Sequence, residues 1–217
     1  MAHLFTSPEI LFPALTSPDA PAILDVRTEE DACADPTRLP TARRLTLAEI
    51  EEGAGPGGPC VVYCQKGGKI SQLAAALLRA RGKEACVLTG GHLAWIAANL
   101  STVTLDLPTR WVMSLDPTLS EVAALWLLRR LIDPSSQALA VARGQIEAAC
   151  STWQAEALPQ DAETLAASLE LSHPVVAQLI FDNALGAERV LRGRLARTGN
   201  PEAALDLIDD LLAGARK

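Results

Sequence analysis

Apolar residues are arranged differently in the two halves of the chain. In the first half they form short runs bounded by proline, glycine or polar turns, at residues 22–26, 43–47, 61–63 and 85–88. Runs of this length and composition predict buried strands. Helical spacing appears most clearly over 71–81, at Leu73, Ala76, Leu77 and Ala80. Strands that alternate with helices predict an α/β fold, with a parallel sheet flanked by helices.

The pattern changes after about residue 100. A polar–apolar alternation that ends at Pro108 predicts a linker or a joining strand. Helical spacing dominates from there on, over residues 118–132, 145–157, 162–171, 174–185 and 201–213. We therefore predict two domains. Residues 1–105 form the α/β domain, and residues 106–217 form a mostly helical domain.

The composition is that of an ordinary globular protein, with 49% hydrophobic and 21% charged residues. The formal net charge of −7 argues against a bulk attraction to nucleic acid or to anionic membranes. No uncharged apolar stretch reaches the roughly 18 residues that span a bilayer. The N-terminal segment, interrupted by Pro8 and Pro13, lacks the pattern of a signal peptide. We therefore expect a cytoplasmic protein that binds neither membranes nor nucleic acid.

The chain has five cysteines. An odd number at irregular spacing is a poor disulfide framework. Cys60 and Cys64 are close enough in sequence to suggest a metal-binding pair. Four residues along a strand, however, span about 13 Å, too far for two thiolates to share one ion. We therefore predict no metal site. Small buried side chains are expected at the other cysteines, Cys33, Cys60, Cys86 and Cys150.

Cys64 stands where a predicted strand passes through a glycine-containing loop into a helix. This arrangement places several backbone N–H groups and the positive end of the helix around the sulfur atom. Lys66 and Lys69 add cationic charge, and Gly67 and Gly68 permit backbone conformations that other residues resist. The charge and the helix end favour the thiolate, which is the nucleophilic form of cysteine. The same loop would receive an anionic substrate.

Three segments of the first domain together resemble the rhodanese family. The loop from Cys64 has glycine at its fourth position and a basic residue at its sixth, as the active-site loop of that family does. Residues 25–27, Asp-Val-Arg, resemble its acidic–apolar–arginine signature after an early strand. Residues 89–95 resemble its Gly-Gly-x-x-x-Trp signature. The resemblance extends over roughly residues 5–100 and implies a rhodanese-like sheet there.

The resemblance also implies a sulfurtransferase. In that family the cysteine takes a sulfane sulfur from a donor as a persulfide and passes it to a second nucleophile. Here Cys64 would be the catalytic residue, thiosulfate or a similar small anion the donor, and cyanide or a cellular thiol the acceptor. The substrate-binding residues would be Gln65, Lys66, Gly67, Gly68 and Lys69. The persulfide would accept hydrogen bonds from the amides of Gly67, Gly68 and Lys69. Asp25 and Arg27 would support the structure, and no cofactor is implied.

The length of the loop separates two kinds of chemistry. Cysteine phosphatases of similar fold use a longer loop with arginine one position later, where this chain has Ile70, which cannot bind phosphate. Sulfur transfer is therefore favoured over phosphate hydrolysis. Lys69 departs from the commoner arginine of the rhodanese pattern, which leaves a point charge without the bidentate fork. Ile70 also stands where a small hydroxyl residue is frequent.

The second half resembles a different family. Residues 109–112 and 126–134 resemble the C-terminal domain of ChrB-type chromate-resistance proteins, with Ala124 at the position of that family's cysteine. Arg129 and Arg130 lie near the end of a predicted helix, where cations offset the helix dipole, and anion binding is the alternative. A second hypothesis follows for the whole chain. It is a chromate-linked regulatory or sensing protein that uses the rhodanese half as a binding module.

Overall fold

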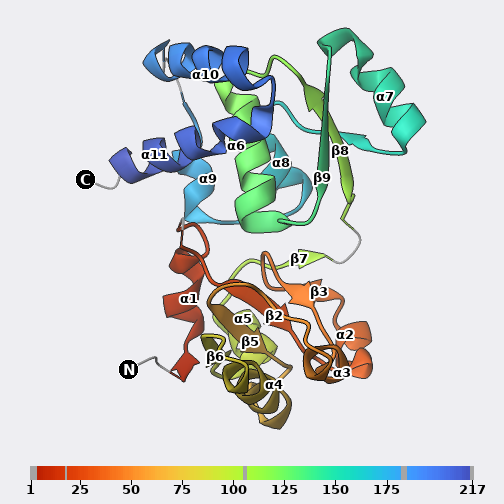
Figure 1. The fold of residues 1–217 in the computed structure, drawn as a ribbon, viewed down its shortest axis with the longest axis vertical. Helices are drawn as coiled ribbons and strands as arrows, with labels where there is room; N and C mark the ends of the chain where they lie inside the picture. Colours follow the sequence, from red (N-terminus) through yellow and green to blue (C-terminus); the bar gives the residue numbers. More distant parts are fainter. Residues whose placement is uncertain (1–3, 18, 105–106, 182–184, 216–217) are drawn as a thin grey trace. The chain divides into compact units, whose positions relative to one another are not determined.

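The structure is a computed structural model of the chain, and it describes residues 4–17, 19–104, 107–181 and 185–215 (Figure 1). The chain divides into two compact units, residues 1–105 and 106–217. Within these described stretches, no helix is both long enough and apolar enough to cross a membrane.

The first unit is built on a five-stranded sheet in which every neighbouring pair of strands is parallel. The strand order is β1-β6-β5-β2-β4. These strands are β1 (Phe5–Thr6), β2 (Ala22–Asp25), β4 (Arg43–Arg44), β5 (Cys60–Tyr63) and β6 (Ala85–Leu88). A separate antiparallel pair joins β3 (Thr37–Arg38) to β7 (Val103–Thr104). The α/β class and the parallel sheet predicted from the sequence are confirmed.

Helices cover both faces of this sheet. They are α1 (Pro8–Ala14), α2 (Glu29–Ala34), α3 (Leu47–Glu51), α4 (Lys69–Ala80) and α5 (Gly91–Ala97). Side chains alternate between the two faces of a strand. On one face, Leu24 and Val62 belong to a core that includes Leu78 of α4. On the other face, Phe12 of α1 meets the buried Trp95 of α5 edge-on, with ring centroids 5.7 Å apart.

Helix α4 begins two residues before the predicted start, at Lys69. Its buried side chains are Ser71, Ala74, Ala75 and Leu78. Of the residues at the predicted helical spacing, Leu77 packs partly against the core, whereas Leu73 is 48% exposed. The buried face is made mainly of small side chains, which let a helix lie close to a sheet. That close packing turns Ser71 toward the end of β5.

The second unit is mostly helical, as predicted, but it also contains a parallel three-stranded sheet that the sequence analysis missed. The order β10-β8-β9 joins β8 (Arg110–Ser114), β9 (Gln137–Val141) and β10 (Glu156–Ala157). Strand β9 reads Gln-Ala-Leu-Ala-Val, and none of its side chains is fully buried. It therefore lacks the continuous β-branched run by which a buried strand is recognised.

The α-helices of the second unit are α6 (Leu119–Leu127), α7 (Ile146–Trp153), α8 (Ala162–Ser168), α9 (Pro174–Gln178), α10 (Leu185–Thr198) and α11 (Leu205–Ala215). Shorter turns are the π-helical η1 (Leu128–Ile132) and the 3₁₀-helical η2 (Arg143–Gln145) and η3 (Pro201–Ala204). The helix predicted over 174–185 ends at Gln178, and residues 182–184 lie outside the described part of the chain. Helix α10 lies largely outside the spans predicted from apolar spacing, because Leu191 is its one buried residue.

Helix α6 is the centre of this unit, since its apolar side chains from Leu119 onward are buried. Trp126 donates a 2.7 Å hydrogen bond from Nε1 to Asp209 of α11. The adjacent arginines of η1 also meet acids, because Arg130 pairs with Asp209 at 2.9 Å and Arg129 pairs with Glu202. Both arginines are therefore paired with carboxylates of the unit, although Nε of Arg130 is buried without a hydrogen-bond partner. The ion pairs favour the structural reading over anion binding.

Candidate active site

Cys64 lies directly beyond the carboxyl end of β5, where the chain turns toward α4. The N-terminus of α5 is hydrogen-bonded to this turn. The backbone N–H of His92 donates to the Cys64 carbonyl at 3.0 Å, and that of Leu93 donates to the Gln65 carbonyl at 3.0 Å. A Cβ atom on Gly91 would overlap the carbonyl oxygen of Cys64. The Gly-Gly segment of the sequence therefore has a direct role in holding the Cys64 loop.

Gly67 is a second glycine on which the loop depends. Its φ angle of +63° lies in the left-handed region, which glycine adopts far more readily than other residues. A Cβ atom there would lie 2.6 Å from the carbonyl oxygen of Leu88 and 2.7 Å from the amide nitrogen of Gly90. By contrast, a Cβ atom on Gly68 would meet no atom within 4 Å. Sterics thus demand glycine at position 67 and tolerate a side chain at position 68.

The Cys64 thiol is buried and has hydrogen-bonding partners. Its Sγ lies 3.3 Å from Oγ of Ser71, and that hydroxyl lies 3.1 Å from the Gly68 carbonyl, so its single hydrogen can point to the carbonyl beside a neutral thiol and to the sulfur beside a thiolate. Burial alone would raise the pKa of Cys64. Hydrogen bonds from the Ser71 hydroxyl and from the amides of Ser71, Lys66 and Gly68 outweigh burial, so the pKa of Cys64 is lowered. The site therefore favours the nucleophilic thiolate.

Ser71 is a site residue that the sequence analysis missed. Of the three predicted amides, that of Gly68 lies at the sulfur, whereas Lys66 and Ser71 supply the others seen at the thiol. The roles of Gly67 and Lys69 amides toward a persulfide stay predictions. One signal was available in the sequence: a hydroxyl residue in the first turn of the helix, three positions after Gly68. A side chain there points back toward the start of its helix.

Replacing Ser71 with alanine should raise the pKa of Cys64, since the hydroxyl that stabilises the thiolate is lost. A hydrogen bond to a charged group contributes about 1.5–3 kcal/mol, so the equilibrium constant for ionisation of Cys64 should fall about ten- to hundredfold. The measurement is the alkylation rate of Cys64 against pH, whose midpoint should move to higher pH. Ser71→Thr, which keeps the hydroxyl, is the control. An unchanged midpoint in Ser71→Ala would show that the amides alone hold the thiolate.

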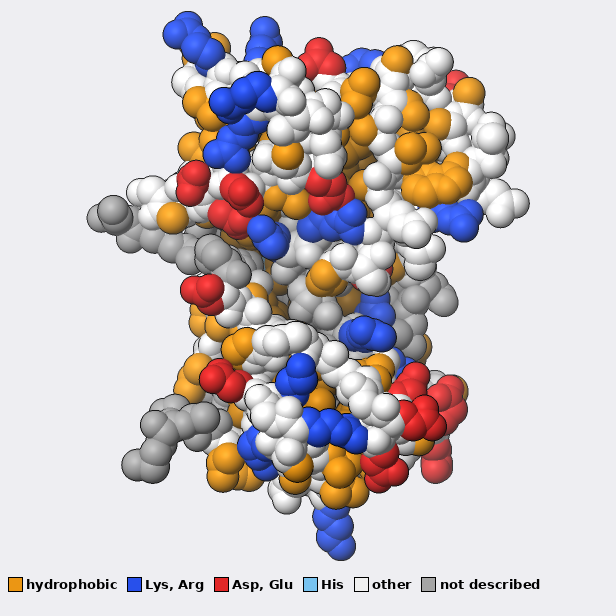
Figure 2. Space-filling model, in the orientation of Figure 1, with side chains coloured by type: hydrophobic (Ala, Val, Ile, Leu, Met, Phe, Trp, Pro, Cys, Tyr) orange, Lys and Arg blue, Asp and Glu red, His pale blue; other side chains and the backbone are white. Residues whose placement is uncertain are grey.

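The remaining predicted substrate-binding residues lie together in the same loop. Lys66 and Lys69 are exposed, and neither forms an ion pair with any residue that the structure describes. Gln65 is half-buried, and its Oε1 atom is buried without a hydrogen-bond partner. The first turn of α4 carries no acidic side chain. Acidic side chains gather instead over α2 and α3 (Figure 2), so the loop keeps its positive charge for an anion.

Asp25 and Arg27 form a buried ion pair at the end of β2. Two nitrogen atoms of the Arg27 guanidinium, Nε and Nη2, donate to the Asp25 carboxylate at 2.8–3.1 Å. The same guanidinium donates to the carbonyls of Asp35 at 3.0 Å and Thr37 at 2.7 Å. Both side chains are at most 2% exposed. The pair ties the segment after α2 to the sheet, and its role as structural support stays a prediction.

Arg27→Ala should destabilise the protein by about 3–5 kcal/mol, because it leaves the Asp25 carboxylate buried without its partner. Urea unfolding of the variant and of the wild type measures this change. Arg44→Ala is the matched control, since Arg44 pairs with Glu29 through a carboxylate that is 84% exposed. A loss no larger for Arg27→Ala than for Arg44→Ala would contradict the structural role assigned to the buried pair.

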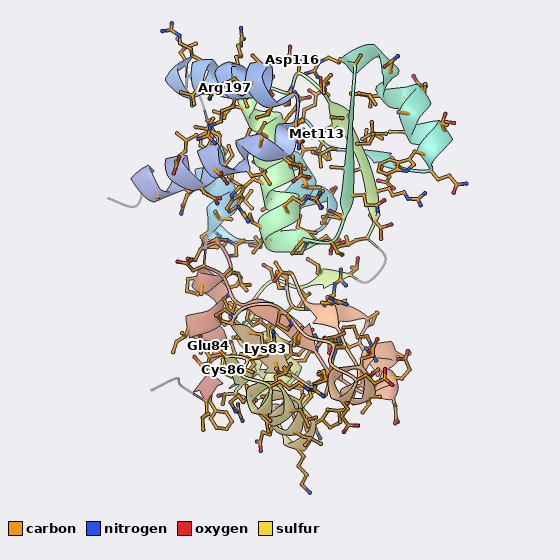
Figure 3. The ribbon with its side chains drawn as sticks, viewed as in Figure 1. Lys83, Glu84, Cys86, Met113, Asp116 and Arg197 are labelled. Atoms are coloured by element: carbon orange, nitrogen blue, oxygen red, sulfur yellow. The ribbon has the colours of Figure 1, made fainter. Side chains whose placement is uncertain are left out.

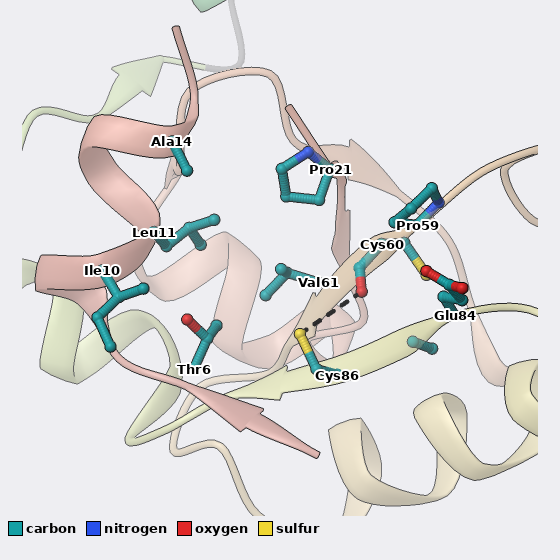
Figure 4. A pocket seen from close by; sticks show the side chains of 11 residues that line it. Thr6, Ile10, Leu11, Ala14, Pro21, Pro59, Cys60, Val61, Glu84 and Cys86 are labelled. Carbon is teal, nitrogen blue, oxygen red and sulfur yellow. Dashed lines mark hydrogen bonds between the residues drawn. The ribbon is translucent and has the colours of Figure 1, made fainter. Parts of the chain in front are cut away.

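Two other cysteines, Cys60 and Cys86, lie toward the amino ends of β5 and β6, away from Cys64. Cys60 opens β5, and Cys86 lies in β6 beside Lys83 and Glu84 (Figure 3). The Cys86 thiol points toward the Cys60 carbonyl, 3.8 Å away, at a largely apolar cavity of about 240 Å³ (Figure 4). Burial raises the pKa of Cys60 to about 11 and also raises that of Cys86. The environment of neither thiol therefore favours the nucleophilic thiolate.

Residues 13–98 match the family described as the Rhodanese-like domain. The first unit is a rhodanese-like domain. A rhodanese homologue from Thermus thermophilus is 38% identical over 42% of this chain and 98% of its own, with a TM-score of 0.34. A thiosulfate sulfurtransferase from Pseudomonas aeruginosa is 26% identical over 45% of this chain and 19% of its own, with a TM-score of 0.39. A protein of unknown function from Rhodopseudomonas palustris, described as a possible tyrosine phosphatase, is 27% identical over 36% of this chain and 67% of its own, with a TM-score of 0.31. No curated protein matches the chain.

The match to the rhodanese-like domain covers the three segments on which the resemblance was based, at 25–27, 64–69 and 89–95. It lies wholly within the first unit. The resemblance of the second unit to the ChrB-type domain stays a prediction. In the part of the chain that the structure describes, no group of three or more His, Cys, Asp or Glu side chains is placed to hold a metal ion.

Proposed function

We propose that the rhodanese-like domain transfers sulfane sulfur through a persulfide on Cys64. The observation that carries the proposal is the thiol environment. Hydrogen bonds from Ser71 and from loop amides lower the pKa of Cys64 even though burial opposes them. The two exposed lysines of the same loop supply positive charge to an incoming anion. A stabilised thiolate beside an anion-binding loop is what nucleophilic attack on an anionic sulfur donor requires.

In the first step the Cys64 thiolate attacks the outer sulfur of thiosulfate. A bond forms between the two sulfur atoms, the sulfur–sulfur bond of thiosulfate breaks, and sulfite leaves with the electron pair. The outer sulfur of the resulting persulfide carries the negative charge, so no proton is needed. Loop amides, with that of Gly68 already at the sulfur, would donate hydrogen bonds to this charge.

In the second step an acceptor attacks the outer sulfur of the persulfide. The bond between the two sulfur atoms breaks, and its electron pair returns to Cys64 as the thiolate. Cyanide would leave as thiocyanate, and a thiolate acceptor would leave as a persulfide. A compartment that keeps thiols reduced, such as the cytoplasm, suits this cycle because Cys64 must be free to react.

Thiosulfate is proposed as the donor because of charge. Lys66 and Lys69 lie within three positions of each other in one loop, and both are exposed. Two cations complement a small dianion better than a bulky donor with a single carboxylate. Ile70, at the position where phosphatases carry arginine, favours sulfur transfer over phosphate hydrolysis.

The test is a steady-state assay of thiocyanate formation from thiosulfate and cyanide, run beside an assay of phosphate release from an aryl phosphate. The proposal expects thiocyanate formation without phosphate release. Phosphate release without thiocyanate would overturn it in favour of hydrolysis. Absence of both activities, together with a Cys64 alkylation midpoint at the ordinary pKa of a thiol, would favour the chromate-linked binding module instead.

A further inference from the structure

His92 is a buried residue of the rhodanese-like domain that the mechanism does not use. Its imidazole is fully buried and stacks on the ring of Tyr63, with ring centroids 6.2 Å apart and planes inclined by 19°. Its backbone N–H holds the Cys64 carbonyl, as described above. The side chain faces the segment after α2, where Asp35 and Thr37 lie. His92 therefore connects that segment to the residue that bears the nucleophile.

The hydrogen bonds around Thr37 determine which nitrogen of His92 carries the proton. The hydroxyl of Thr37 lies 2.7 Å from Oδ1 of Asp35 and 3.4 Å from Nε2 of His92. A hydroxyl has one hydrogen, and the short contact to the carboxylate takes it. Oγ1 of Thr37 is then an acceptor, so Nε2 of the neutral imidazole must be the protonated nitrogen.

Nδ1 of His92 is consequently a bare lone pair. It is buried, has no hydrogen-bond partner, and lies 3.6 Å from Oδ2 of Asp35. A lone pair that faces a carboxylate is repelled by it, whereas a protonated Nδ1 would form an ion pair at this distance. A second proton on the imidazole, at Nδ1, would therefore turn this repulsion into an attraction to Asp35.

Burial and nearby charged groups act on the pKa of His92 in opposite directions. Burial and the nearby Arg27 lower the pKa of His92, and the carboxylates of Asp35 and Asp25 act in the opposite direction. Lowering prevails, so His92 is neutral at pH 7 and gains its proton below its ordinary pKa. The Tyr63 hydroxyl stays neutral there, since its pKa is raised well above the ordinary value.

We propose that Asp35 and His92 form a proton-binding pair next to the Cys64 loop, and that the bound proton stabilises the Cys64 thiolate. His92 is a positioning residue here, not a catalytic one. Two consequences of protonation reach Cys64. First, a buried positive charge is added to His92, whose amide donates to the Cys64 carbonyl. Second, the imidazole is drawn toward Asp35, and this attraction fixes the start of α5. The proposal rests on the proposed function in one respect only, that the stabilised thiolate is the nucleophile of sulfur transfer.

Asp35→Asn is the informative variant. The amide oxygen can keep the hydrogen bonds that Oδ1 accepts from Thr37, while the amide N–H₂ takes the place of Oδ2 and donates to the bare Nδ1. The substitution removes the negative charge that favours protonation of His92, and the new hydrogen bond stabilises the neutral imidazole. The Asp35 side chain is 36% exposed, so the fold should tolerate the change. Glu30→Gln, which removes an exposed charge from the helix α2 that precedes Asp35, is the control.

The experiment follows His92 by NMR and Cys64 by alkylation between pH 4.5 and 9, with the modified peptide quantified by mass spectrometry (pH limits chosen to span about two units around the ordinary histidine pKa). In the wild type, the logarithm of the alkylation rate should fall with decreasing pH. At the His92 midpoint protonation raises the thiolate fraction, so the fall should be interrupted there by a step toward higher rate. The step should be about two- to tenfold, the size of an indirect coupling. In Asp35→Asn both the NMR midpoint and the step should move together to lower pH.

Glu30→Gln should leave the His92 midpoint and the step in the alkylation rate at their wild-type pH. His92→Gln, whose amide can still donate to Thr37, should give a line without a step. A step that stays in place in Asp35→Asn, or a His92 midpoint that does not respond to this substitution, would overturn the proposal. Neither readout uses a sulfur donor. Failure of sulfur transfer would therefore leave both measurements valid, and failure of the proton-binding pair would leave sulfur transfer untouched.

Discussion

Cys64→Ser should abolish sulfur transfer and leave the fold intact. Oxygen in place of sulfur cannot form the persulfide, and a serine hydroxyl is not ionised at neutral pH, so turnover should fall by about 10³-fold or more. The substitution is nearly isosteric, and the hydrogen bond to Ser71 can persist. The measurement is thiocyanate formation, with circular dichroism to confirm the fold.

Cys86→Ser is the matched control for this variant. Cys86 is a half-buried cysteine of the same sheet, but its thiol lies near the Cys60 carbonyl, at the end of β5 away from Cys64. Its activity should stay within about twofold of the wild type, because a residue that does not touch the reacting atoms contributes little to the barrier. Equal losses in Cys64→Ser and Cys86→Ser would contradict the assignment of the nucleophile.

Gly67→Ala should be the most damaging small substitution in the loop. Alanine at a φ of +63° costs about 1–2 kcal/mol, and forcing a Cβ atom against the Leu88 carbonyl adds about 1–3 kcal/mol. The backbone atoms it meets cannot move aside without displacing Cys64 or the start of α5. We therefore expect both a lower unfolding midpoint and the loss of most Cys64 reactivity.

Gly68→Ala is the control for Gly67→Ala, since its added methyl group would meet open space and its amide would be kept. Urea unfolding and the alkylation rate of Cys64 should be measured for both variants. Gly68→Ala should lie much closer to the wild type in each. If the two variants were equally impaired, the loop would depend on general flexibility, and the steric role assigned to Gly67 would be wrong.

The part of the site that is local in sequence could be predicted from the sequence. Cys64, the two glycines and the two lysines all lie within residues 64–69, from the end of a strand to the start of a helix, so their proximity needs no tertiary information. The parallel sheet could also be predicted, because the apolar runs at 22–26, 61–63 and 85–88 have the composition of buried strands.

Contacts between distant segments could not be predicted in this way. The Gly91 contact with the Cys64 carbonyl depends on how β6 and α5 pack beside β5. The position of His92 against Asp35 depends on packing between α5 and the segment after α2, which lie far apart in the sequence. Ser71 was within reach, but the apolar spacing of α4 pointed to Leu73 as the inward face. Small residues, which carry little hydrophobic signal, form that face instead.

The most direct test of the account is the intact mass of the protein after incubation with thiosulfate, followed by addition of cyanide. The account expects wild-type protein to gain the mass of one sulfur atom and to lose it on adding cyanide, with release of thiocyanate. Cys64→Ser should show no gain. A wild-type protein that stays unmodified by thiosulfate and by other sulfane donors, or a sulfur adduct that persists in Cys64→Ser, would contradict the persulfide on Cys64.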